Sequence, residues 1–289
     1  MKLSVIIPAH KELFLQKTID SLLEVSELGD DIEVLPVWDG TEFMTPIKAD
    51  SRVRVLHFAS QRGMRAAINV GLTEATGKFV MKLDAHCAFD QGFDRKMVES
   101  CVDNWLLIPR RYSLDDINWS INEHKRDQPR DYHYLTYPLP LYPRMTPQVY
   151  DRSEGPEIDD TMSFQGSCWV ANREIFMRRV GLLDDRKKTY GSFAAEQLEI
   201  GLKYWLKGGE VKVIKSTWYA HLRKMPRHYA TGKFQMKRLR FKTNWNWATE
   251  YWLNNRDPDI IYKFSWLIEK FWPVPGWPED RSQWNPFKI

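Results

Sequence analysis

The chain has 289 residues, with 42 Lys and Arg against 38 Asp and Glu, a formal net charge of +4 and 43% hydrophobic residues. A chain of this size buries a core without help from disulfides or metals, and 13 Trp, 12 Tyr and 14 Phe with near-balanced charge exclude intrinsic disorder. Because no run of 18 apolar residues occurs, we predict no membrane-spanning helix. Three cysteines without metal-type spacing favour a reducing compartment, so we expect a cytoplasmic protein.

The first hundred residues alternate between short apolar runs and helix-like segments with one apolar face. The pattern predicts strands at 3–8, 32–38, 53–58 and 78–83, and helices at 11–25, 62–74 and 91–102. Strands that alternate with helices of this length predict an α/β fold, with a mostly parallel sheet and helices on both faces.

The alternation stops in the middle of the chain. Six prolines between 110 and 160, among many Tyr, Asp and Arg, predict a long loop insertion or a lid. Regular structure then resumes with a strand at 167–171, a helix capped by Asn172, a helix at 195–206 that two glycines end, and a strand at 210–214. From Trp245 onward the tail is rich in Trp and Pro, which excludes a regular helix over 272–278.

The strongest local signal is Asp84-Ala85-His86, which follows the apolar strand that ends at Leu83. Open α/β sheets bind their ligands beyond the carboxyl ends of the strands. An Asp and a His two residues apart are able to share one divalent cation, such as Mn²⁺, which would neutralise a leaving diphosphate. By itself the pair is also typical of a strand-end Asp that caps a turn beside an ordinary His.

Two further motifs suit a nucleotide. Asp39 also ends a strand, where its carboxylate either accepts hydrogen bonds from a nucleobase or ribose, or stabilises the turn before Gly40. The stretch from Gln61 to Arg65 opens a helix with two cations, which suits an anion at a helix N-terminus as well as an ordinary solvated turn.

Two carboxylates in the helix at 195–206 are candidates for proton transfer. Glu196 and Glu199 are three residues apart and share one face of the helix. A hydroxyl that must lose a proton, or an oxocarbenium-like centre, needs such a group, whereas Glu199 and Lys203 also have the spacing of an i,i+4 ion pair. We therefore assign function to Glu196, and either structure or the acceptor side to Glu199. His221 follows a strand and is either a third metal ligand or an interior histidine.

In their order along the chain, these motifs resemble the nucleotide-sugar glycosyltransferases of the GT-A fold, family 2-like, and most closely the catalytic domain of polypeptide N-acetylgalactosaminyltransferases. In that family an Arg-rich helix start leads to a strand that ends Asp-x-His-Cys, as 62–66 leads to 83–87 here. The family's Gly-Glu-Asn-x-Glu helix, followed by Trp-x-x-Gly-Gly, is similar to 195–199 and 205–209. Its later metal-binding His, Arg-Lys and His-Tyr are similar to His221, Arg223-Lys224 and His228-Tyr229.

The resemblance covers roughly 1–253, and it implies a Rossmann-like GT-A catalytic domain over 1–221, with a loop insertion at about 110–160. We expect a basic segment and an aromatic-rich extension over 222–289 that packs on this domain. Ala195 and Gln197 stand where the family has Gly and Asn, and neither a membrane anchor nor a lectin domain is expected. These departures leave the acceptor open and argue against a secretory-pathway protein glycosylation enzyme. The resemblance leaves both inversion, as in family 2 relatives, and retention, as in the acetylgalactosaminyl relatives, open.

The resemblance also implies a role for each motif in a UDP-sugar-dependent hexosyltransferase. Asp84, His86 and His221 would hold Mn²⁺ (or Mg²⁺), Asp39 would contact the uracil or ribose, and Glu196 would face the acceptor hydroxyl. The implied donor-binding residues are Pro8, His10, Glu12, Asp39, Arg62, Gly63, Arg65, Asp84, Arg223, His228 and Tyr229. The implied acceptor side includes Glu199 and Trp169.

The acceptor itself is suggested only by a basic segment. Eight Lys and Arg and no acid lie between 223 and 242, and several Trp follow from Trp245 onward. The segment suits the donor diphosphate, a polyanionic acceptor or a solvated helix face. Cations interleaved with aromatic rings suit nucleic acid, so a hydroxymethylated pyrimidine flipped out of DNA is one expected acceptor. Its phosphates would be contacted by Lys237, Arg238, Arg240 and Lys242. Because Trp also stacks on sugars, a glycan, lipid-linked or protein hydroxyl is the alternative, and a non-enzymatic nucleic-acid-binding protein on the same scaffold is a third.

Overall fold

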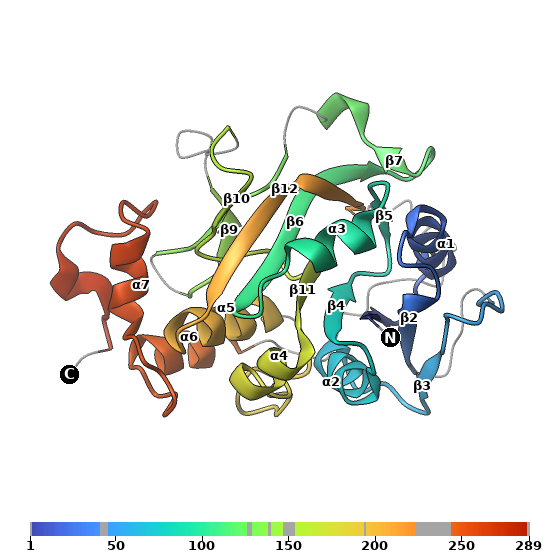
Figure 1. Ribbon diagram of the computed structural model, residues 1–289. Coiled ribbons are helices and arrows are strands. Elements are labelled where there is room, and N and C mark those ends of the chain that lie inside the picture. The colour runs from blue at the N-terminus through green and yellow to red at the C-terminus, as the bar shows by residue number, and fades with distance from the viewer. Residues whose placement is uncertain are drawn as a thin grey trace.

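The computed structural model describes residues 2–40, 46–125, 129–137, 140–146, 154–193, 195–223 and 244–287. Within these residues a ten-stranded mixed sheet carries helices on both faces (Figure 1). The strands are β1 (Leu3–Ala9), β2 (Ile32–Asp39), β3 (Leu56–Phe58), β4 (Phe79–Leu83), β5 (Cys87–Phe89), β6 (Trp105–Asp115), β7 (Ser120–Ile121), β8 (His133–Leu135), β9 (Pro143–Met145), β10 (Ile158–Asp160), β11 (Cys168–Asn172) and β12 (Glu210–His221). The helices are α1 (Leu15–Val25), α2 (Met64–Glu74), α3 (Phe93–Ser100), α4 (Arg173–Arg179), α5 (Glu196–Leu206), α6 (Trp245–Leu253) and α7 (Phe264–Lys270), with short 3₁₀ turns at Gly29–Asp31, Glu123–Lys125 and Arg281–Trp284.

The order of strands in the sheet is β10-β12-β6-β11-β4-β1-β2-β3, with β5 on β12 and β7 on β6. The pairs β1–β2, β1–β4, β2–β3 and β6–β12 are parallel, whereas β11 lies antiparallel between β4 and β6. The predicted α/β fold is thus confirmed, with β11 and the edge strand β10 as antiparallel members. Because the parallel strands point the same way, the carboxyl ends of β1, β2, β4 and β12 lie along one edge of the sheet.

The alternating residues of β1 explain why both faces are covered. Side chains in a strand point in turn to opposite faces. Val5 and Ile7 belong to a buried cluster with α1 and α3, whereas Ile6 belongs to the cluster with α2 on the other face. A Cβ at Gly71 would lie 2.3 Å from Ile6 Cγ2, so this glycine lets α2 lie directly on β1.

The short strand β5 lies where the sequence predicted none, and the two long strands β6 and β12 also differ from the prediction. β6 runs to Asp115, where the sequence predicted no strand and the start of a long loop at 110, and β12 continues to His221 instead of ending at 214. The two strands run side by side through the middle of the sheet (Figure 1), and their register shifts between Ile214 and Trp218. Polar residues enter the strands near this irregularity, and they hide the strand pattern from a reading of apolar runs. The predicted insertion also carries the short strands β7, β8 and β9.

The aromatic C-terminal extension is part of the core. Trp252 and Trp277 belong to the same buried cluster as α5. Trp252 Nε1 donates to the Tyr190 hydroxyl over 2.6 Å, and Trp277 Nε1 donates to the carbonyl of Leu135 over 2.7 Å. These contacts tie α6 and the segment after α7 to the preceding 221 residues. No helix among the described residues is long and apolar enough to cross a membrane.

Candidate active site

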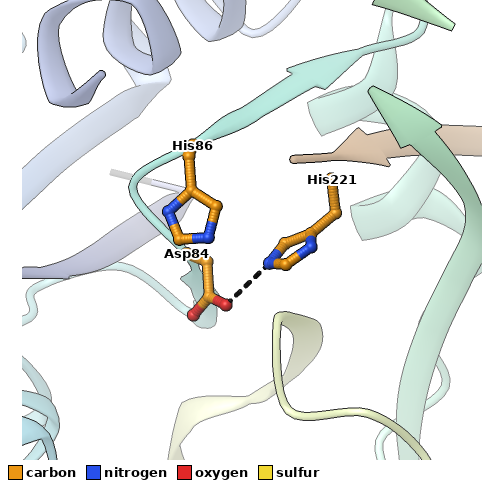
Figure 2. Close-up of side chains that lie close together, drawn as sticks. All are labelled: Asp84, His86 and His221. Atoms are coloured by element: carbon orange, nitrogen blue, oxygen red, sulfur yellow. Dashed lines mark hydrogen bonds and ion pairs between the residues drawn. The ribbon is translucent and has the colours of Figure 1, made fainter. Parts of the chain in front are cut away.

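Three side chains that could ligate a metal meet at the carboxyl edge of the sheet (Figure 2). Asp84 and His86 lie in the turn between β4 and β5, and His221 ends β12, where it pairs with Cys87 of β5. One ligand atom from each of the three residues lies within 4.8 Å of the other two. One carboxylate and two imidazoles at this spacing fit a divalent cation such as Mn²⁺. The three side chains predicted from widely separated motifs therefore come together.

His221 is held between a donor and an acceptor. Arg111 Nη2 donates to His221 Nδ1 over 3.0 Å, because a guanidinium has no acceptor atom. The ring proton therefore sits on Nε2, which donates to Asp84 Oδ2 over 3.0 Å. Burial, with His86 and Arg111 beside the ring, lowers the pKa of His221 to about 3, so the imidazole is neutral. Ligation of a cation by Nε2 requires this proton to move to Nδ1, which would deprive Arg111 of its acceptor.

A buried lysine that the sequence analysis missed orients Asp84. Lys82 Nζ lies 2.5 Å from Asp84 Oδ1 and also donates to the carbonyl of Gly166 over 2.6 Å. Burial alone would raise the pKa of Asp84, but Lys82 and the two histidines hold it well below its usual range. With Oδ1 on Lys82, Oδ2 is the carboxylate oxygen that faces His221.

Glu196, the predicted catalytic carboxylate, lies near Asp84 at the start of α5. Its Oε1 is 3.8 Å from Lys82 Nζ, and its buried Oε2 has no hydrogen-bond partner in the described part of the chain. Burial raises the pKa of Glu196, and the negative charge of Asp84 adds to this, although Lys82 opposes it. The Glu196 carboxylate packs directly against the backbone of Gly166, since a Cβ at that position would lie 2.2 Å from Glu196 Oε1. Ala195 enters the helix with a left-handed φ of 58°, which is strained for a residue with a side chain.

The predicted nucleoside side forms a second group at the ends of β1 and β2. His10 Nδ1 donates to the carbonyl of Asp39 over 2.5 Å. The Asp39 carboxylate accepts the backbone N–H groups of Arg62 and Gly63 over 2.6 and 2.8 Å. Asp39 therefore stabilises the turn into α2, a structural role different from the local turn before Gly40 that was its structural interpretation from the sequence. Contact of Asp39 with a nucleobase stays a prediction.

Glu12 connects this group to the metal-ligating residues. Its Oε2 lies 3.4 Å from His86 Nδ1, and Oε1 accepts the N–H of Phe14 over 3.2 Å. A carboxylate beside the second nitrogen of a histidine fixes the ring that ligates a metal. Glu12 is thus placed to orient His86, while Pro8 lies partly buried near the end of β1.

Three predicted site residues lie in the core instead. Arg65 and Glu199 form a buried ion pair, and Arg65 Nε also donates to the carbonyl of Asp184 over 2.9 Å. Glu199 pairs in addition with Lys203 over 2.6 Å, as its spacing allowed. Trp169 is fully buried and stacks on Phe176 with ring centroids 4.9 Å apart. The donor role of Arg65 and the acceptor roles of Glu199 and Trp169 are therefore corrected, because these side chains offer no surface to a ligand.

Part of the predicted site lies outside the described residues. Arg223 is exposed and is the last residue described before 244. The remaining predicted residues of the basic segment fall beyond it: His228, Tyr229, Lys237, Arg238, Arg240 and Lys242. Their assignments stay predictions from the sequence.

Two residues near the candidate site, Lys82 and Arg111, were not assigned in the sequence analysis, although the sequence holds a signal for each. Lys82 is a single charged residue inside the apolar run 79–83, where a cation needs a partner. Arg111 follows the apolar run 106–109 at the same edge of the sheet. Neither could be assigned without knowing that β4, β6 and β12 bring them to Asp84 and His221.

Comparison with known proteins agrees with this geometry. The model of the family described as glycosyl transferase family 2 matches residues 4–179. The chain belongs to this family. Its curated relatives include human polypeptide N-acetylgalactosaminyltransferase 18, 22% identical over 212 residues (71% of this chain, 34% of the relative), and mouse polypeptide N-acetylgalactosaminyltransferase 4, 24% identical over 318 residues (98% and 53%). The chain thus spans between about a third and about half of the length of these relatives.

Solved structures share the fold of this family 2 chain. GalNAc-T7, solved with UDP, GalNAc and Mn²⁺, aligns with a TM-score of 0.62 at 16% identity, covering 78% of this chain and 43% of GalNAc-T7. Residues 1–349 of TarS from S. aureus, in complex with UDP-GlcNAc, align with a TM-score of 0.50 at 13% identity, covering 78% and 59%. At these identities the likeness concerns the fold, and it confirms the predicted GT-A architecture.

Proposed function

We propose that this chain transfers a sugar from a UDP-sugar to an acceptor hydroxyl with the help of Mn²⁺ or Mg²⁺. The observation that carries the proposal is the convergence of Asp84, His86 and His221 within 4.8 Å, at the sheet edge where α/β proteins bind ligands. The family 2 membership supports the reaction class. The UDP, UDP-GlcNAc and Mn²⁺ in the two related structures support the donor and the metal.

Different residues of the chain would bind the metal, the nucleoside and the diphosphate. When bound, the cation would supply positive charge against the leaving diphosphate. Asp84 Oδ2 and the two histidines would hold it, while Lys82 keeps the carboxylate charged and oriented. His10, Asp39, Arg62 and Gly63 would form the nucleoside side, with Pro8 and Glu12 next to them, and the exposed Arg223 would meet the diphosphate together with His228 and Tyr229.

Glu196 would act on the acceptor hydroxyl. A general base works best when its pKa lies near the working pH, and burial has already raised the pKa of Glu196. Its Oε2 is buried and has no hydrogen-bond partner among the described residues, so it is available to take a proton. Its ammonium neighbour Lys82 would stabilise the ionised base before the transfer.

For the acceptor we propose a hydroxymethylated pyrimidine in DNA, which makes the chain a DNA-modifying enzyme. The support is the basic segment of eight Lys and Arg between 223 and 242, since the phosphate backbone attracts such a segment. A glycan, lipid-linked or protein hydroxyl is the alternative, and the polypeptide acceptors in the relatives' names favour it. A non-enzymatic nucleic-acid-binding role would need neither the metal ligands nor Glu196. The cytoplasmic location stays a prediction, as does the association with DNA.

The test is incubation of the protein with Mn²⁺ and a panel of UDP-sugars, with and without hydroxymethylated DNA, peptides or glycans. We expect UDP release that EDTA abolishes and that one acceptor class accelerates. Mass spectrometry of the acceptor then identifies the hydroxyl that carries the sugar. Binding of DNA without UDP release from any sugar would favour the non-enzymatic alternative.

A further inference from the structure

Three arginines lie near one another beside His221, and one of them, Arg111, contacts the ring nitrogen that does not face Asp84. Arg111 donates to His221 Nδ1, and Arg223 follows His221 by two residues. Arg111 and Arg130 face each other in an antiparallel bridge, where the N–H of Arg130 donates to the carbonyl of Arg111 over 2.8 Å. Side chains that face each other in this way start about 4.5–5.5 Å apart, and like charges there destabilise the pairing. The arrangement therefore needs a compensating negative charge.

The described residues do not supply that charge. None of their carboxylates forms an ion pair with Arg111, Arg130 or Arg223, whereas the neighbouring Arg110 pairs with Asp131 over 2.6 Å. Arg111 is 8% exposed, and its Nε has no hydrogen-bond partner in the described part of the chain. Burying a cation without an anionic partner is costly, so such a group indicates an anionic ligand.

The positive charge of the arginines affects the pKa values of two groups, Arg130 and His133. Burial, with Arg111 and Arg223 nearby, lowers the pKa of Arg130. Burial, with Arg111 and Arg130 nearby, lowers the pKa of His133 to about 3. His133 is 7% exposed, and its Nδ1 has no hydrogen-bond partner within the described ranges. The buried side of this cluster is thus lined by donors and by positive charge.

The hydrogen bond from Arg111 to His221 would not survive metal binding. A cation on Nε2 leaves the ring proton on Nδ1, which then donates and no longer accepts. When a cation binds to His221, Arg111 would lose the one side-chain acceptor that it has among the described residues. An oxyanion is the acceptor that a guanidinium fork fits best, because it takes two parallel hydrogen bonds.

We propose that Arg111, Arg130 and Arg223 form a binding site for a phosphate group, beside His221 and apart from Asp84, His86 and His221 Nε2, which would hold the metal. The proposal rests on the proposed function and extends it by two residues, Arg111 and Arg130, that the proposed function does not use. The ligand chemistry is a phosphate oxyanion. It comes either from a phosphodiester of a polyanionic acceptor or from the phosphate of the UDP donor that is not bound to the metal.

The experiment compares the wild type with the variant R111Q/R130Q and with R54Q/R281Q, which loses the same charge at two exposed arginines far along the chain from this cluster. The probes are UDP with Mn²⁺, measured by calorimetry, and a fluorescent 12-base-pair DNA, titrated over a salt series. If the phosphate belongs to the acceptor, DNA affinity falls at least tenfold and the log–log salt slope flattens by about one to two units, while UDP affinity stays within twofold. If it belongs to the donor, UDP affinity falls at least tenfold and the DNA slope is unchanged.

The proposed site would be refuted if R111Q/R130Q bound both UDP and DNA with affinities within twofold of those of R54Q/R281Q. If R111Q/R130Q does not fold, R130Q at the partly exposed position is measured in its place, with R54Q as its control. Inorganic phosphate also has to raise the melting temperature of the wild type above that in chloride of equal ionic strength, by more than it does in R130Q. Failure of the proposed function is recognised separately, as absent UDP release from UDP-sugars in a wild type that still shows the arginine-dependent phosphate binding.

Discussion

The ammonium of Lys82 lies 2.5 Å from Asp84 Oδ1, so one oxygen of that carboxylate is occupied and the other faces His221. The same ammonium is 3.8 Å from Glu196 Oε1. Lys82 thus joins the candidate metal ligands to the candidate base. It is 1% exposed, lies beside these two carboxylates and also donates to the carbonyl of Gly166.

Replacing this lysine should change the pH dependence of catalysis. Lys82 lowers the pKa of Glu196 against the effect of burial, so in Lys82→Met the carboxyl group loses its proton only at higher pH. We expect the acid limb of the kcat/KM profile for UDP release to move upward, and the maximal value to fall roughly 10–100-fold because Asp84 is less well oriented. Lys212→Met, which removes a lysine paired with Asp160 on the far strand β10, serves as control. An acid limb that stays in place would show that Lys82 does not act on the base.

Loss of the Asp84 carboxylate should abolish metal binding. Asp84→Asn removes the one negatively charged ligand of the triad while keeping its shape. We expect no calorimetric signal for Mn²⁺ and at least a 100-fold loss of UDP release, with the circular dichroism spectrum retained. Asp20→Asn, at a surface pair with Lys48, should bind Mn²⁺ as the wild type does. Equal Mn²⁺ affinity in both variants would remove the triad from the mechanism.

Replacing Glu196 should increase the stability of the fold and decrease the activity. Burial raises its pKa, so the ionised carboxylate destabilises the fold above that pKa, and the penalty disappears below the usual value of 4.5, where both folded and unfolded chains are protonated. Glu196→Gln should therefore melt higher than the wild type at pH 7–8, and this gain should shrink toward pH 4. Loss of the base should lower kcat by about 10²–10⁴-fold.

The glycine that faces Glu196 offers an independent check. A Cβ at position 166 would lie 2.2 Å from Glu196 Oε1, so Gly166→Ala must displace the carboxylate. We expect kcat to fall with little change in Mn²⁺ affinity. Gly201→Ala, where the nearest atom is 3.3 Å away on the ring of Phe164, is the matched control. A Gly166→Ala enzyme with full activity would argue that Glu196 is not positioned for catalysis.

Two measurements should distinguish a structural role of Asp39 from a nucleotide-binding role. Its two oxygens accept the N–H groups of Arg62 and Gly63, so Asp39→Asn turns one acceptor into a donor that opposes an N–H. We expect a loss of about 1–3 kcal/mol in the free energy of unfolding, measured by urea titration without nucleotide. For the wild type with Mn²⁺, UDP should raise the melting temperature more than GDP does. Equal shifts by the two nucleotides would leave Asp39 with its structural role alone.

His133 should make the fold sensitive to mild acid. Its pKa falls from 6.5 to about 3 on folding, so between these values the unfolded chain binds a proton that the folded chain does not. Stability therefore decreases as the pH drops below 6.5, by up to about 1.4 kcal/mol per pH unit from this residue. His133→Gln should flatten the dependence of the unfolding free energy on pH by that amount between pH 6 and 5. His124→Gln, at an exposed histidine, should leave the slope unchanged.

The sequence by itself determined the fold class and the strand ends that carry the candidate site residues. Apolar runs and helical faces reveal burial directly, because each is a local repeat along the chain. For this reason most strands and helices up to residue 102 were predicted, although the short strand β5 was not, and Asp84, His86, His221 and Glu196 were singled out as candidates. The order of these motifs was enough to indicate the family that the comparisons then showed.

Only the tertiary structure decided which charged side chains meet. Arg65 and Glu199 are 134 residues apart and form a buried pair, although each one alone suggested a ligand contact. Arg111 and His221 are 110 residues apart, and their contact depends on β6 and β12 pairing in parallel through an irregular register. The partner of a buried charge is set by strand order and register, which no local pattern encodes, so the electrostatics of this site became visible only in the folded chain.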